Sequence, residues 1–179
     1  MIRYYLAIFL LTLASDAYTQ HPDFVNPVIK EFGGIHPLEH ATVKPDPTLR
    51  YQIVVDVVSG QSDPRKINPA LNNVARMINL HAVGGVSADS LDIVLATHGG
   101  ATVALLKDED YREKFGCDNP NLPLIDALVE AGVVMTVCGQ SLLHEEIEPD
   151  RVYSKVGIAT SMLTTVTMYQ QKGYHLLKF

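Results

Sequence analysis

The chain has 179 residues, of which 47% are hydrophobic and 19% are charged, and its formal net charge is −6. This balance is typical of a globular domain and excludes a disordered chain. Because the chain is acidic and its basic residues form no cluster, we expect no nucleic-acid partner held through its phosphates.

The first 17 residues have the pattern of a secretion signal. Arg3 gives a positive start, residues 4–13 form a short apolar run, and residues 15–17 form a cleavage site with small residues at its first and last positions. The apolar run is too short to span a bilayer, although an uncleaved anchor is the alternative. We therefore expect a signal peptide over residues 1–17 and a mature protein that is periplasmic or secreted, without membrane contact.

Residues 18–49 are rich in proline, histidine and glycine. This composition predicts an extended N-terminal arm with little regular structure that lies on the surface of the following domain. His36 and His40 have a spacing that suits a metal site in a helix, but Pro37 argues against a helix there. We interpret both histidines as surface residues.

Three apolar runs without alternation indicate strands that are buried on both faces, as in a parallel sheet. They cover residues 53–58, 91–97 and 133–138. Two weaker runs predict further strands over residues 152–158 and 174–177.

Helical patterns separate these strands. Asn68-Pro69 and Asn119-Pro120 each combine an N-cap with proline at the first helical position. The expected helices cover residues 69–83, 101–106, 108–115, 120–131, 141–146 and 161–172. Alternating strands and helices with right-handed crossovers predict one α/β domain over residues 50–179, a three-layer α/β/α sandwich around a five-stranded parallel sheet.

Cys138 ends the third strand, at the sheet edge where α/β proteins place their ligands. Gly139 allows the backbone to turn closely, and Gln140 and Ser141 open the next helix with free N–H groups directed toward the sulfur. These groups favour a thiolate over a thiol. The alternative is a small buried cysteine that only fills space.

His98 follows the second strand and therefore lies at the same edge, with Gly99 and Gly100 after it. Cys117, just before the helix that leads to the third strand, is expected there too. The topology thus predicts one imidazole and two sulfurs in one region. Other interpretations stay open: His98 as a helix cap, and Cys117 either as a free thiol or in a disulfide with Cys138 that closes a loop of about twenty residues.

Several common sites are not indicated by the sequence. It has no C-x-x-C motif, and it has neither a dinucleotide-binding G-x-G-x-x-G nor a Walker A motif. Zinc would need histidine ligands that the pattern does not supply. We therefore expect no metal and no cofactor.

Four segments together resemble the exported, periplasmic branch of the DsrE/DsrF-like proteins. They are VVMTVCGQSLL, HGGA after the second strand, YREKFG with the following DNPNLPLIDAL, and the closing MYQQKGYHLL. The resemblance covers nearly the whole mature chain. It implies a compact α/β/α domain with a five-stranded parallel sheet, and association into dimers, trimers or hexamers. Cytoplasmic relatives carry sulfur as a persulfide on a cysteine.

This chain departs from the sulfur-carrying relatives in one loop. Their relay cysteine follows the second strand, where this chain has His98-Gly99-Gly100-Ala101 and no cysteine. The resemblance therefore points to Cys138 as the sulfur-handling residue, with His98 as its catalytic neighbour. The candidate substrate-binding residues are Gly99, Gly100, Cys117, Gly139, Gln140 and Ser141.

Two functions remain open at this point. The first is a periplasmic protein that binds or carries a sulfane sulfur or small thiol compound on Cys138, supplied by a small molecule or a partner sulfur carrier. The second is a non-enzymatic module of the same fold that binds a small ligand or assembles with other subunits. A redox pair of Cys117 and Cys138 is a third possibility.

The signal pattern makes a direct prediction about the mature protein. When the full chain is expressed in a bacterium, we expect the purified protein to begin near Tyr18 or Gln20, because the small residues of positions 15–17 permit cleavage there. N-terminal sequencing checks this. Retention of Met1 in a membrane fraction would contradict it.

Overall fold

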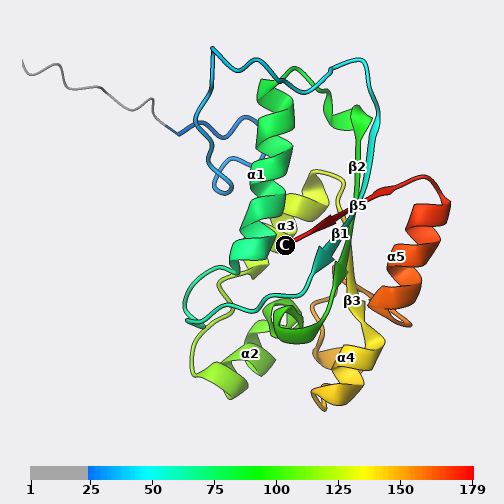
Figure 1. Ribbon diagram of the computed structural model, residues 1–179. Coiled ribbons are helices and arrows are strands. Elements are labelled where there is room, and N and C mark those ends of the chain that lie inside the picture. Colours follow the sequence, from blue (N-terminus) through cyan, green and yellow to red (C-terminus); the bar gives the residue numbers. More distant parts are fainter. Residues whose placement is uncertain (1–23) are drawn as a thin grey trace, which may run out of the picture.

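The computed structural model describes residues 24–179, so the expected signal peptide and the start of the arm lie outside the described residues. The described chain forms a central sheet with helices on both faces (Figure 1). None of the helices in this range is long and apolar enough to cross a membrane.

The sheet has five parallel strands in the order β4-β3-β2-β1-β5. The strands are β1 (Tyr51–Val57), β2 (Leu91–Thr97), β3 (Val134–Cys138), β4 (Gly157–Ala159) and β5 (His175–Lys178). The predicted five-stranded parallel sheet is therefore confirmed. Since all the strands point the same way, the loops after β1, β2 and β3 meet at one edge.

The helices divide between the two faces of the sheet. They are α1 (Pro69–Val83), α2 (Asp108–Phe115), α3 (Leu122–Glu130), α4 (Gly139–His144) and α5 (Met162–Gln171), with short 3-10 helices η1 (Ala88–Ser90), η2 (Gly99–Leu105) and η3 (Pro149–Arg151). Figure 1 shows α1 and α3 on one side of the sheet and α5 alone on the other. We call these the α1 side and the α5 side.

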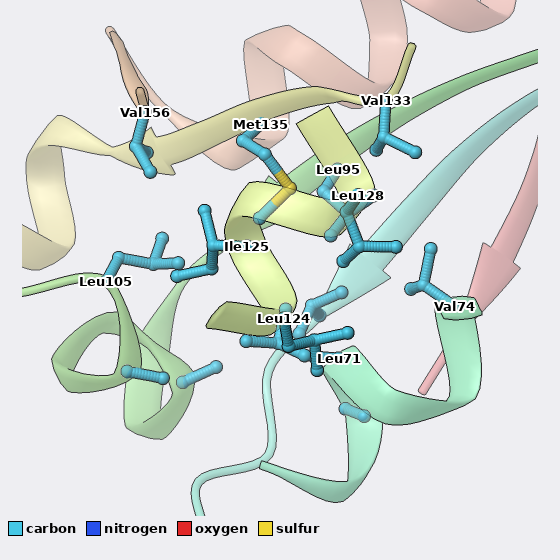
Figure 2. Close-up of a cluster of buried hydrophobic side chains, with 14 of the residues drawn as sticks. Leu71, Val74, Leu95, Leu105, Leu124, Ile125, Leu128, Val133, Met135 and Val156 are labelled. Atoms are coloured by element: carbon cyan, nitrogen blue, oxygen red, sulfur yellow. The ribbon is translucent and has the colours of Figure 1, made fainter. Parts of the chain in front are cut away.

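The main hydrophobic core lies on the α1 side (Figure 2). Leu71 of α1 and Leu124 of α3 are fully buried there against Leu95 of β2. Burying a leucine side chain stabilises the fold by about 1.5–3 kcal/mol, so this layer supplies most of the stability. The α5 side has only a small cluster around Val54, Ala96 and Val166.

Two elements begin at least two residues later in the sequence than predicted. The fourth strand is Gly157–Ala159 and not 152–158, because Val152 instead pairs with Leu106 in an isolated antiparallel bridge and is buried from a loop. The helix α3 begins at Leu122 and not at Pro120. The Asn119 side chain accepts a hydrogen bond from the Asn121 N–H and donates to two loop carbonyls, so it stabilises the loop and does not cap the helix.

The described part of the N-terminal arm is fixed to α1 by one buried asparagine. The Asn79 carbonyl accepts hydrogen bonds from the Val28 and Ile29 N–H groups, at 3.0 and 2.9 Å. Its amide donates to the carbonyls of Ile29, Phe32 and Gly33. Ile29 itself is buried in the main core. The arm is thus packed into the domain at this point, although it contains no helix or strand between residues 24 and 49 beyond an isolated bridge.

Asn79→Ala should lower the free energy of unfolding by about 2 kcal/mol or more, because it leaves several buried backbone groups without partners. Urea denaturation of the mature protein measures this loss. Asn73→Ala is the matched control, since the Asn73 side chain bonds only to the exposed Arg76 in the described structure. Equal and small effects of both substitutions would show that the arm is not held by Asn79.

Candidate functional site

The loops that follow β1, β2 and β3 pack against one another at the carboxyl edge of the sheet. The His98 N–H donates to the Val57 carbonyl at 2.9 Å, and the Gly99 N–H donates to Ser141 Oγ at 3.2 Å. Gly99 has φ +54°, a conformation that glycine adopts without strain. These contacts join the His98-Gly99-Gly100 loop to the Cys138–Ser141 turn, as the topology predicted.

Cys138 is the last residue of β3 and immediately precedes α4. The helix begins two residues earlier than predicted, at Gly139, and the Gln140 and Ser141 N–H groups of its first turn interact with the sulfur. The Cys138 side chain is on the α5 side, because it alternates with Met135 and Val137, which face the main core. Cys138 is 4% exposed, and its Sγ lies 4.0 Å from Ser161 Oγ.

The surroundings of Cys138 favour the thiolate. Burial raises the pKa of the thiol, but hydrogen bonds from the Met162 N–H, the Ser141 hydroxyl and the Ser141 and Gln140 N–H groups lower it, and the net effect is a pKa below the ordinary value. Met162 opens α5, so donors from the starts of two helices converge on one sulfur. A lowered pKa increases the fraction of thiolate, which is the nucleophilic form of cysteine.

The His98 ring pairs with Asp56 and not with the sulfur. His98 Nε2 lies 2.7 Å from Asp56 Oδ1, and Lys178 Nζ lies 3.2 Å from Asp56 Oδ2. Asp56 is 5% exposed although it carries a carboxylate, so both of its oxygens have a cationic or N–H partner. His98 does not cap η2 through its side chain either.

The predicted substrate-binding residues Gly100, Gly139 and Gln140 have different surroundings in the structure. A Cβ on Gly139 would lie 2.9 Å from the Ala159 carbonyl oxygen, so this glycine permits close contact with the end of β4. A Cβ on Gly60 would lie 2.7 Å from the Gly100 carbonyl oxygen, so the Gly100 loop packs closely on the loop after β1. The Gln140 side chain is exposed and reaches the Thr160 carbonyl at 3.5 Å.

Cys117 does not join this site. Its Sγ contacts the Pro64 carbonyl at 3.8 Å, and its side chain packs against the core on the α1 side. Cys138 faces the other side of the sheet, and both thiols are free. Cys117 thus contacts the loop after β1, which belongs to the predicted edge of the sheet, but it lies on the α1 side and does not line the Cys138 site.

Sequence reasoning missed Asp56, Lys178 and the start of α5. Asp56 is the one charged residue in the run IVVDVV, and a carboxylate near the end of a buried parallel strand is a recognisable signal. Ser161 and Met162 were placed in the final helix, but nothing in the sequence showed that this helix begins over Cys138. Among residues 24–179, no group of three or more histidine, cysteine, aspartate or glutamate side chains is arranged to hold a metal ion.

Two solved structures of similar fold cover the α/β domain. One is a protein of unknown function, MTH1491 from Methanobacterium thermoautotrophicum, with a TM-score of 0.53 and 16% identity. The other is the ychN protein from E. coli, with a TM-score of 0.50 and 16% identity. Each match covers 72% of this chain and 99% of the other, and at this identity it shows the fold alone.

No curated protein matches the chain significantly. The model of the DsrE/DsrF-like family matches residues 52–179, which is well over half of the sequence and includes every strand of the sheet but the first residue of β1. The chain therefore belongs to the DsrE/DsrF-like family.

Proposed function

We propose that the protein is an exported sulfur-handling protein that carries or binds a sulfane sulfur on Cys138. The observation that carries this proposal is the convergence of N–H and hydroxyl donors from α4 and α5 on the Cys138 thiol, which lowers its pKa. A thiolate is the nucleophile in sulfur transfer, and a persulfide needs the same donors when its sulfur leaves. Membership of the DsrE/DsrF-like family supports the same chemistry.

The burial of Cys138 restricts its reactants. Only 4% of the residue is exposed, and Ser161 lies beside the sulfur. Small sulfur compounds such as polysulfide, thiosulfate or a low-molecular-weight persulfide suit such a thiol better than a bulky donor. A partner sulfur carrier would have to present its sulfur at the end of an extended segment.

The place of action and the assembly belong to the same proposal. The pattern of residues 1–17 supports export to the periplasm. Exposed apolar side chains on and near α5, which include Leu163, Met168 and Leu176, support self-association into a homo-oligomer.

The second candidate is a binding or assembly module in which Cys138 only fills space. The low exposure of Cys138 favours this alternative, because a packed structural thiol is also buried. The two candidates differ in the reactivity of the native protein, which the following measurements address.

Reduced mature protein treated with inorganic polysulfide should gain the mass of one sulfur atom, as read by intact-mass spectrometry. Cys138→Ser should abolish the gain, because it removes the proposed acceptor. Cys117→Ser is the matched control and should keep it, since Cys117 lies on the other side of the sheet. If the native protein gains no sulfur and Cys138 is alkylated only after unfolding, the binding module is the better account.

The lowered pKa makes a prediction about pH. Below its pKa a thiol is protonated and unreactive, so Cys138 should be alkylated faster than free cysteine at neutral pH and lose this advantage in alkaline solution. Ser141→Ala removes one donor and should slow alkylation at neutral pH, with the difference vanishing in alkali.

Ser87→Ala is the matched control for this measurement, because Ser87 is exposed and its side chain contacts only Ser90 among the described residues. Iodoacetamide kinetics in a Cys117→Ser background isolate the Cys138 thiol. A rate that is the same in Ser141→Ala and in the parent at every pH would contradict the role of the hydroxyl.

A further inference from the structure

We propose that Asp56 is a positioning residue that holds His98 as the general base of the Cys138 site. In this role His98 takes a proton from an acceptor thiol that removes the sulfane sulfur from Cys138. The inference rests on the proposed function, because it describes how the carried sulfur leaves.

Asp56 is a buried carboxylate with a polar partner on each oxygen. This carboxylate is on β1 near the carboxyl end of the strand, and it is almost fully buried. Its two oxygens have separate partners on the two neighbouring strands or their loops: His98 Nε2 at 2.7 Å and Lys178 Nζ at 3.2 Å. A charge-assisted hydrogen bond of this length holds the imidazole in one orientation.

The contact with Asp56 selects the tautomer of His98. An ionised carboxylate accepts hydrogen bonds and donates none, so Nε2 of His98 carries the proton. In neutral imidazole the lone pair is then on Nδ1. Within the part of the chain that the structure describes, Nδ1 has no hydrogen-bond partner. Nδ1 is therefore the ring nitrogen that is free to take a proton.

The register of the sheet sets the position of His98 relative to Cys138. Thr97 of β2 lies opposite Val137 of β3, so His98 and Cys138 are the next opposed pair in the register. His98 is extended, with φ −156° and ψ −178°, and thus continues the path of the strand. The bond to Asp56, which alternates with the core-facing Val55 and Val57, places the His98 ring on the α5 side. The ring and the sulfur therefore border the same part of the sheet edge.

The chemistry follows from this arrangement. An acceptor thiol attacks the outer sulfur of the Cys138 persulfide, forms a new S–S bond and breaks the bond between that sulfur and Sγ. The electron pair of the broken bond goes to Cys138, which leaves as a thiolate, and the proton of the acceptor thiol goes to Nδ1. Total charge is conserved, because a thiolate and an imidazolium form together. Asp56 then faces the imidazolium and stabilises it, as an aspartate does in a serine protease triad.

The titratable and charged side chains that face the His98 ring are compatible with its role as a general base. Asp56 comes from β1, Lys178 from β5 and Cys138 from β3. The helix α5, which packs on this face, has no acidic residue, lysine, arginine or histidine. Its titratable side chain, Tyr169, packs on Tyr174 near the opposite end of the helix.

The test separates loading of the sulfur from its discharge. Protein in a Cys117→Ser background is loaded with inorganic polysulfide and desalted, and glutathione is added at neutral pH. The loss of the added sulfur is followed by intact-mass spectrometry. We expect Asp56→Ala and His98→Gln to slow this discharge by about 100-fold, which is the low end for loss of a general base. The difference should disappear in alkali, where glutathione ionises without help.

Asp118→Ala is the matched control. It removes an exposed carboxylate that pairs with Arg112 and contacts neither His98 nor Cys138 in the described structure, so discharge should stay within about twofold of the parent. Sulfite is the control acceptor, because its dianion, which is abundant near neutral pH, attacks the outer sulfur without losing a proton and leaves as thiosulfate. Discharge to sulfite should be equally fast in the parent, Asp56→Ala and His98→Gln.

A spectroscopic measurement tests the positioning directly. Nitrogen NMR of the unloaded parent should show His98 with the proton on Nε2 when neutral, and Asp56→Ala should abolish this preference. If Asp56→Ala fails to fold, Asp56→Asn is measured in its place, with slower discharge expected from the lost charge.

The outcomes are distinct. Discharge to glutathione at the parent rate in Asp56→Ala or Asp56→Asn overturns the inference and leaves the proposed function standing. The inference also fails if Asp118→Ala slows discharge as much as Asp56→Ala does, or if the neutral ring carries its proton on Nδ1. Failure of the parent to load sulfur overturns the proposed function and the inference together.

Discussion

The parallel register of β1, β2 and β3 is the constraint on which the candidate site depends. It brings Asp56, His98 and Cys138 to one edge of the sheet and one face, although they are far apart in the sequence. A shift of one residue in any of these strands would turn its side chain to the opposite face. The hydrophobic core on the α1 side fixes this register, because Ile53, Leu95 and Met135 must face α1 and α3 together. Hydrophobic packing on the α1 side thus fixes the positions of the candidate site residues on the α5 side.

The two faces contribute different properties. The α1 side contains the main hydrophobic core, and hydrogen bonds from Asn79 hold the N-terminal arm against it. The α5 side has one helix and a small apolar cluster. The polar side chains of Asp56 and His98 can therefore lie near the sheet edge on this side without being covered by apolar residues. The start of α5 supplies a donor to the sulfur, and α4 supplies the others directly from the next turn of the chain. Cys138 is therefore buried and yet has a lowered pKa, a combination that a cysteine which merely fills space does not require.

Much of the fold was predictable from the sequence, because three unbroken apolar runs separated by capped helices specify a parallel sheet. The weak strand was misplaced, since Val152 and Val156 are apolar for burial from a loop and not for pairing. The position of Cys138 followed from the topology alone. The partner of His98 did not, because a side chain at the edge can turn toward either neighbouring strand. The side of the sheet on which Cys117 lies was not predictable for a related reason: an irregular loop after α2 has no period from which its path can be derived.

The central claim is that the fold stabilises the Cys138 thiolate. The most direct measurement is a pH titration of thiolate ultraviolet absorbance in native protein that carries Cys117→Ser, with the unfolded protein as reference. The account predicts that the native thiol ionises at a lower pH than the unfolded one. A native thiol that ionises at the same pH as the unfolded chain, or at a higher pH, would contradict it.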